Sequence, residues 1–127
     1  MKEICAVIRI NKINETKRAL VDAGISSMTA LKALGRGKGE VDYLIQPSGG
    51  NVMADASSAG EQGPKLFPKR VLTIVVPDNM AQETVNTIMR VNQTGQPGDG
   101  RIFVMPVSDA FRVRTEERGD DAINEQA

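Results

Sequence analysis

Histidine and tryptophan are absent from this chain of 127 residues, and cysteine occurs once, at Cys5. One cysteine without histidine excludes an intramolecular disulfide, a serine-histidine-aspartate triad and a histidine-ligated zinc site. Cys5 stands in the apolar run of residues 4–8, which predicts a buried structural thiol and not a nucleophile. Much of the common side-chain chemistry of enzymes is therefore missing.

A net charge is also missing, because 16 lysines and arginines balance 16 aspartates and glutamates. No overall field draws the chain to nucleic acid or to an anionic membrane, so an anion site must come from locally placed cations. No apolar run approaches the roughly 18 residues of a membrane span, and the first residues have no signal-peptide pattern. We expect a soluble cytoplasmic protein of one domain, residues 1–127, small enough to gain stability from oligomerisation.

The first half of the chain predicts the order strand, helix, strand. Residues 4–10 alternate as a strand does, with Ile10 on the same face as the isoleucines before it. Asn11 is the expected helix N-cap, and the helical spacing that follows ends at Gly24. Residues 28–34 predict a second strand. The helix residues expected to share one face are Ile13, Thr16, Leu20 and Ala23.

The second half repeats this order. Residues 71–76 predict an apolar strand, residues 77–78 turn and cap, and a helix runs to Gly95 before a returning strand at residues 101–107. Two such halves predict an α+β fold, the ferredoxin-like double β-α-β sandwich, in which a mainly antiparallel sheet carries helices on one face. The helix residues expected on the apolar face are Ala81, Val85 and Ile88.

The connection between the halves, residues 39–67, is rich in glycine, serine, alanine and proline. Connections longer than about 12 to 15 residues in compact domains are usually functional or disordered. This one is either an idle linker or a loop that contacts a partner or responds to an effector, and its position within a domain favours the second interpretation. Residues 119–127 are expected to be a flexible tail.

Three segments could hold an anion, and each has a plain structural alternative. Residues 35–39 read Gly-Arg-Gly-Lys-Gly, in which glycines let backbone amides approach an anion and cations add charge, but a tight turn has the same composition. Residues 94–101 read Thr-Gly-Gln-Pro-Gly-Asp-Gly-Arg, which is a nest for a polyphosphate or a bulged turn. Residues 112–115, Arg-Val-Arg-Thr, place two arginines on one face of a strand, where they bind phosphates or serve only solubility.

The combination of these segments resembles a known family. Thr-x-x-x-Gly-Asp-Gly-Arg-Ile-Phe-Val followed by Arg-Val-Arg-Thr resembles the C-terminal signature of PII signal-transduction proteins. The resemblance covers nearly the whole chain and leaves out only residues 39–67. Its other matches are residues 28–29 with the glycine loop after them, 68–69, 75–78 and 120–123.

PII subunits form a compact trimer with ATP or ADP in the clefts between neighbours, and a long loop grips the target. The resemblance implies that residues 98–101 hold phosphates, that Arg112 and Arg114 join them across the cleft, and that Lys69 helps bind 2-oxoglutarate. A cation suits a ligand with two carboxylates. The resemblance also implies that Thr29 and Val75 lie at the adenine end and that Gly37 and Lys38 lie near the phosphates. The implied ATP or ADP contacts are Thr29, Gly35, Gly37, Lys38, Val75, Gly98, Asp99, Gly100, Arg101, Arg112 and Arg114.

The chain departs from the PII pattern in the first glycine loop. The family continues it as Gly-x-Gly-Arg-Gln-Lys-Gly, whose glutamine serves Mg²⁺ and 2-oxoglutarate, but residues 35–39 contain no glutamine. Alignment without a gap pairs Lys38 with the family arginine, whereas a two-residue shift pairs Arg36 with that arginine and Lys38 with the lysine. The metal and 2-oxoglutarate site is then lost, rebuilt with a group such as Gln46, or supplied by a companion subunit.

The shortened glycine motif and enlarged loop resemble the nitrogenase-regulating PII branch encoded beside nitrogenase genes. That branch works as pairs of paralogues, inhibits nitrogenase by direct binding, and releases it when 2-oxoglutarate and ATP signal nitrogen shortage. The resemblance implies a homotrimer or a hetero-oligomer with a paralogous PII-like subunit. Because the only tyrosine, Tyr43, lies close to the start of the loop, we expect no uridylylation.

The expected function is therefore nitrogen-status regulation through nitrogenase and not catalysis. A first alternative is a general PII regulator of an ammonium transporter or a nitrogen-assimilation enzyme. A second is a small ferredoxin-like enzyme with Asp99 or Glu116 as base, which the lack of histidine and of an activated nucleophile disfavours. A third is a structural or metal-handling trimer, for which one cysteine without histidine is a poor ligand set.

Overall fold

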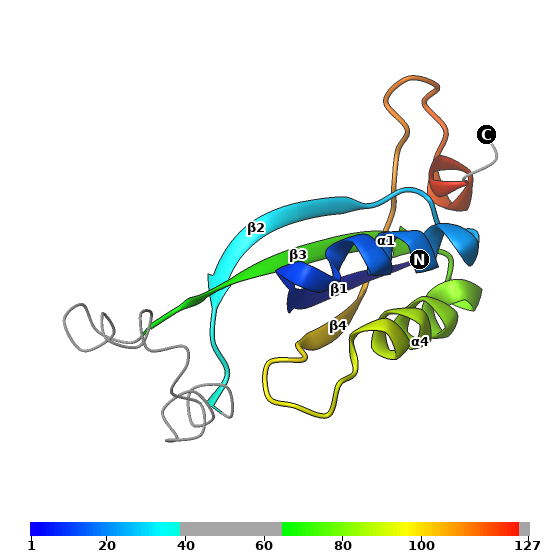
Figure 1. Ribbon diagram of the computed structural model, residues 1–127. Coiled ribbons are helices and arrows are strands. Elements are labelled where there is room, and N and C mark those ends of the chain that lie inside the picture. The colour runs from blue at the N-terminus through cyan, green and yellow to red at the C-terminus, as the bar shows by residue number, and fades with distance from the viewer. Residues whose placement is uncertain (39–64, 125–127) are drawn as a thin grey trace, which may run out of the picture.

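The computed structural model describes residues 1–38 and 65–124 of the chain. Within these residues, four strands form one sheet in the order β2-β3-β1-β4, and each neighbouring pair is antiparallel. Helices α1 and α4 both lie on one face of the sheet (Figure 1), which confirms the predicted α+β ferredoxin-like arrangement. The bounds are β1 Lys2–Arg9, α1 Ile13–Asp22, β2 Thr29–Gly35, β3 Phe67–Val76, α4 Ala81–Asn92 and β4 Arg101–Pro106.

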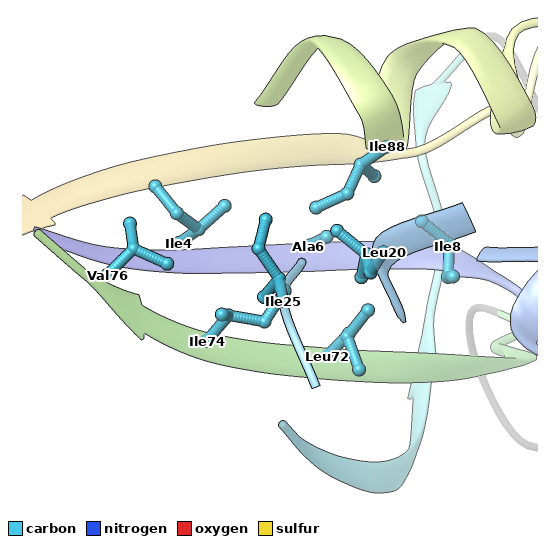
Figure 2. Close-up of a cluster of buried hydrophobic side chains, with 9 residues drawn as sticks. All are labelled: Ile4, Ala6, Ile8, Leu20, Ile25, Leu72, Ile74, Val76 and Ile88. Atoms are coloured by element: carbon cyan, nitrogen blue, oxygen red, sulfur yellow. The ribbon is translucent and has the colours of Figure 1, made fainter. Parts of the chain in front are cut away.

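The core lies between the sheet and the two helices (Figure 2). Alternation along β1 turns Ile4, Ala6 and Ile8 toward the helices, and none of them is more than 1% exposed. Burying an isoleucine or leucine side chain in this way contributes about 1.5 to 3 kcal/mol. The buried apolar residues are Ile4, Ala6, Ile8, Leu20, Ile25, Leu72, Ile74, Val76 and Ile88.

In the first half, the structure differs from the predicted strand and helix boundaries at the end of β1. The prediction that Ile10 belongs to the strand is wrong, because Ile10 begins the 3-10 helix η1 (Ile10–Lys12) and is 43% exposed. Asn11 is not the N-cap, since it lies inside η1 and Lys12 precedes α1 without a side-chain cap. The helix ends as predicted, with Gly24 at φ +89°.

β3 begins four residues earlier than predicted. Phe67 pairs with Gly35 of β2, so residue 67 belongs to the strand and not to the connection. The central position of β3 would ordinarily exclude Pro68, but β1 ends at Arg9 opposite Lys69 and leaves Pro68 beside β2 alone. The rest of the predicted connection, apart from residues 65–66, lies outside the described residues.

The helix of the second half is shorter than predicted and has no aspartate cap. α4 ends at Asn92, three residues before Gly95, and the 3-10 helix η3 (Asp78–Met80) precedes it. The carboxylate of Asp78 accepts a contact of 2.9 Å from the Met1 amino group. Its hydrogen bond with that amino group, with the nearby charge of Lys2, lowers the pKa of Asp78.

The chain after β4 forms a projecting arm, residues 107–118 (Figure 1). The predicted strand at residues 112–115 is wrong, because these residues form a turn between Phe111 and Arg118, which make an isolated bridge. Glu116 N donates to Arg112 O at 2.7 Å, and Glu116 has φ +65°. In the predicted tail, Gly119–Ile123 forms the 3-10 helix η4; its flexibility stays a prediction, and residues 125–127 lie outside the described part.

The other face of the sheet, the open face, carries no helix of the described chain. Cys5 lies on it and is only partly buried, so the prediction of a buried core thiol is wrong; the alternation that buries Ile4 turns Cys5 to the opposite side. Much of this face is apolar. Its apolar residues include Val7, Leu31, Val71, Val75, Phe103 and Met105, all exposed or half-buried.

Candidate functional site

The glycine loop, residues 94–100, is organised around the carboxylate of Asp99. Thr94 donates to it from its backbone N at 2.8 Å and from Oγ1 at 2.5 Å, and Gly95 N donates at 3.0 Å. Arg9 Nη1 donates at 2.6 Å, while Arg9 Nη2 donates to Pro97 O at 2.8 Å. The loop is thus closed on itself and tied to the end of β1.

These contacts keep Asp99 ionised. Partial burial of the carboxyl opposes ionisation, but the hydrogen bonds from Thr94, Arg9 and Gly95 outweigh it and hold the pKa of Asp99 well below its usual range. A carboxylate with a lowered pKa and four donors is a poor general base. Asp99 therefore shapes the loop, and its side chain is not placed to take a proton from a substrate.

Two glycines let the loop approach the sheet. Gly98 and Gly100 have φ of +96° and +109°, a region that other residues rarely adopt. A side chain at Gly100 would also collide with the carbonyl oxygen of Val7 on β1. The loop backbone therefore lies directly against β1, immediately before Arg101 begins β4.

Arg9 belongs to the candidate site but was not predicted from the sequence. It is the last residue of β1, and its side chain is 25% exposed, as is that of Asp99. The only local signal is a cation that ends an alternating apolar strand. Asn92 was missed as well: it is 4% exposed, and its Nδ2 donates to Thr16 Oγ1 at 3.0 Å, which joins the end of α4 to α1 just before the loop.

The strand register places three predicted contacts, Thr29, Val75 and Arg101, on the open face. Thr29 pairs with Thr73, so it lies diagonally beside Val75, and the structure brings these two predicted adenine contacts together. Arg101 pairs with Val7 and also faces the open side. Thr29 and Arg101 stand on the two edge strands, separated by three strand spacings or about 14 Å. One chain therefore does not bring the predicted adenine contacts to its glycine loop.

The end of the sheet beside Asp99 gathers the remaining predicted contacts of the body. Lys69 pairs with Arg9 on one side and Ala33 on the other, and it is only 6% exposed. Gly35 ends β2 two residues further on. Gly37 is half-buried and Lys38 is exposed just beyond it.

The two arginines of the arm have different surroundings. Arg112 Nη1 donates to Glu117 Oε1 at 2.9 Å, and Arg112 Nη2 donates to carbonyls of η4 and its flank, including Asn124 O at 2.9 Å. Arg114 is exposed at the turn. Because the arm is a turn and not a strand, strand alternation does not set the two arginines on one face. Both lie on the projecting arm, away from the glycine loop of the same chain (Figure 1).

Neither a metal-ligand cluster nor a membrane-spanning helix is found in the part of the chain that the structure describes. No group of three or more cysteine, aspartate or glutamate side chains there could hold a metal ion. In residues 1–38 and 65–124 there is also no helix long and apolar enough to cross a membrane.

Comparison with known proteins identifies the family. The family model of nitrogen regulatory protein P-II matches residues 1–117. The chain is 50% identical to a nitrogen fixation nifHD-region GlnB-like protein 2 of Methanobacterium ivanovii, over 97% of this chain and 99% of the relative, and 44% identical to a nifHD1-region counterpart of Methanosarcina barkeri with the same coverage. It is 38% identical to nitrogen regulatory protein P-II 1 of Escherichia coli, over 97% of this chain and all of the relative.

The chain belongs to the P-II family of nitrogen regulatory proteins. The predicted resemblance to PII proteins encoded in nitrogen-fixation regions is confirmed by the relatives' names. The family consists of regulatory signalling proteins, which supports the expectation that this chain is not an enzyme.

Proposed function

We propose that this chain is a cytoplasmic nitrogen-status regulator that binds ATP or ADP in a cleft shared by neighbouring chains and acts on nitrogenase by direct binding. The glycine loop is the observation that supports the nucleotide site. Hydrogen bonds to Asp99 fix the shape of this loop, and Arg101 is the residue directly after it. Backbone N–H groups beside glycines, with a guanidinium next to them, suit the phosphates of a nucleotide.

The cleft has to be shared between chains, because the proposed adenine contacts and the proposed phosphate contacts of one chain lie far apart. Thr29 and Val75 stand near one edge of the sheet and Arg101 on the other, so the adenine contacts of one chain need the phosphate contacts of another. The apolar open face supports assembly, since Phe103 is 49% and Met105 39% exposed there. We propose a homotrimer or a hetero-oligomer with a paralogous PII-like subunit, in which Arg114 reaches a neighbour's nucleotide.

Lys69 is the proposed contact for 2-oxoglutarate. A lysine ammonium suits a ligand with two carboxylates, and Lys69 lies beside Arg9 at the end of the sheet near Asp99. The usual loop glutamine has no counterpart in residues 35–39, and Gln46, its possible replacement, lies outside the described residues. Mg²⁺ would therefore reach this site with the nucleotide phosphates, which are its common ligands in proteins.

Nitrogenase is the proposed target because relatives of nearly the same length are named for nitrogen-fixation regions. Target binding is assigned to the connection, most of which lies outside the described residues. The second candidate is regulation of an ammonium transporter or a nitrogen-assimilation enzyme, and the likeness to the general regulator of Escherichia coli favours it.

The nucleotide part is tested by calorimetric titration of the assembled protein with ATP, ADP and AMP, with and without Mg²⁺ and 2-oxoglutarate. We expect ATP and ADP to bind, and 2-oxoglutarate to bind only when ATP is present. Binding of none of the adenine nucleotides would reject the proposal.

Replacing Arg101 with alanine sharpens this test. The change removes one charged phosphate contact, so the binding free energy of ATP should weaken by about 1.5 to 3 kcal/mol. Arg18→Ala, at an exposed arginine on α1, is the matched control and should leave ATP affinity unchanged. Equal ATP affinity of wild type and the Arg101 variant would remove Arg101 from the site.

The target is tested with purified nitrogenase components and a purified ammonium channel, each offered to the immobilised protein. We expect nitrogenase to be retained in the absence of effectors and released by ATP with 2-oxoglutarate. Retention of the ammonium channel alone would favour the second candidate.

A further inference from the structure

The β2–β3 ladder continues past the end of β1 as a two-stranded stem. β1 pairs with β3 as far as Lys69, whereas β2 pairs with β3 on to Gly35 and Phe67. Figure 1 shows this end of β2 and β3 extending beyond β1. The stem therefore has two faces, of which one continues the open face and the other continues the face that the helices cover.

The helix-side face has an unusual pairing of charges just before the stem begins. Lys32 pairs directly with Arg70, which is also paired with Ile8 of β1, so two cations stand opposite each other at the base of the stem. Like charges in this position destabilise a strand pair. Arg70 makes one long hydrogen bond of 3.3 Å to the carbonyl oxygen of Lys69, and a guanidinium has five N–H donors. The pair thus keeps donors and charge for an anion.

An apolar pair lies next to these cations on the same face. Leu34 pairs with Pro68, two residues beyond Lys32 and Arg70, and alternation turns both pairs to the same side. Leu34 is 66% exposed and Pro68 is exposed as well. The four residues form the stem patch: an apolar centre at Leu34 and Pro68 beside the two cations.

The described strands around the stem patch carry no opposite charge. Residues 26–38 and 65–77 contain six lysines and arginines and no aspartate or glutamate. The next acidic residues toward the connection, Glu40 and Glu61, lie outside the described residues. A partner that complements the stem patch would therefore bring carboxylates.

We propose that the stem patch is a docking surface for a protein segment in which an apolar side chain is flanked by carboxylates. The apolar side chain would cover Leu34 and Pro68, and a carboxylate would bridge Lys32 and Arg70. A nucleotide or free phosphate would match the cations but leave Leu34 uncovered. This surface is separate from the proposed 2-oxoglutarate contact, because alternation turns Lys69 to the open face. The inference deepens the proposed target binding and rests on it.

The test uses a fluorescent synthetic peptide in which one leucine is flanked by glutamates, titrated with the full protein and followed by anisotropy. Lys32→Glu should weaken binding about tenfold or more, because it reverses the charge that the peptide meets. The same change should maintain or raise the melting temperature, since it sets a carboxylate opposite Arg70. Weaker binding with undiminished stability separates docking from misfolding.

Two comparisons make the test specific. Lys17→Glu, at an exposed lysine on α1, changes the net charge equally and should leave the peptide affinity within about twofold. Leu34→Ser should weaken binding of the same peptide, and a peptide with lysines around the leucine should bind less tightly than the acidic peptide. Each of these results supports the proposal.

The proposal is overturned if the Lys32 variant binds the peptide as wild type does, or if the Lys17 variant loses as much affinity. Equal binding of the basic peptide, or no binding of the acidic peptide to wild type, overturns it as well, and so does displacement of the acidic peptide by inorganic phosphate at matched ionic strength. ATP titration of the Lys32 variant distinguishes the two proposals, because the nucleotide site should be intact there whatever the peptide result.

Discussion

The glycine loop and the arm differ in what holds them. Asp99 of the loop is bound by Arg9 of β1, 90 residues away in the chain. The contacts of Arg112 in the arm reach Glu117 and Asn124, only 5 and 12 residues away. The phosphate half of the proposed site is thus formed within one chain by tertiary contacts, whereas the hydrogen bonds of Arg112 in the arm are local.

The largest expected effect is that of Gly100→Ala on the glycine loop. The new side chain would meet the Val7 carbonyl oxygen in a backbone conformation with positive φ, so the free energy of unfolding should fall by about 2 to 4 kcal/mol, measured by urea denaturation. Gly24→Ala is the matched control, because Gly24 has positive φ without neighbouring atoms and should lose only about 1 kcal/mol. Equal losses would mean that the loop does not lie against β1.

Asp99→Asn should have the next largest effect. The amide cannot accept the full set of hydrogen bonds from Thr94, Gly95 and Arg9, so stability at pH 7 should fall by about 1 to 3 kcal/mol in urea denaturation. Asp22→Asn, at an exposed aspartate that ends α1, is the control and should change stability little.

The pH dependence of Asp99 tests the same contacts. Its pKa is lowered in the folded chain, so its stabilising effect is complete above the unfolded value of about 3.9 and is lost as pH falls through the folded value. The wild-type chain should therefore lose stability below about pH 4 more steeply than Asp99→Asn. Parallel curves for the two proteins would contradict the lowered pKa.

The smallest effects are expected in the arm, and they should differ between its two arginines. Arg112→Ala removes the contacts to Glu117 and η4, so amide hydrogen exchange should quicken in residues 119–123 while global stability changes by no more than about 1 kcal/mol. Arg114→Ala should leave exchange unchanged and weaken ATP binding in the assembled protein. The reverse result would exchange the roles assigned to the two residues.

The sequence predicted the elements well where the signal was local. Alternation at Ile4, Ala6 and Ile8 and helical spacing at Thr16 and Leu20 both correspond to buried residues. The prediction failed where tertiary contacts or turn hydrogen bonds set the local structure. Asn11 has the composition of a cap but lies in η1, and the arginines near Glu116 alternate as in a strand but form a turn.

The candidate site was predicted in its composition and only partly in its geometry. The glycines and Asp99 predicted a loop that could hold a polyphosphate. The structure explains the need for glycine there, because Gly98 and Gly100 have positive φ. The pairing of Asp99 with Arg9 could not be predicted, because nothing near Arg9 in the sequence indicates its partner. The separation of Thr29 from Arg101 likewise depends on the strand order.

By itself, the sequence determined the family and the alternation of the strands, because these depend on residue type and on neighbours in the chain. The tertiary structure alone decided that β1 lies between β3 and β4. That order brings Arg9 to Asp99, and the register between β2 and β3 sets Lys32 opposite Arg70. Contacts between residues far apart in the chain arise from packing the sheet against its helices, which no local pattern encodes.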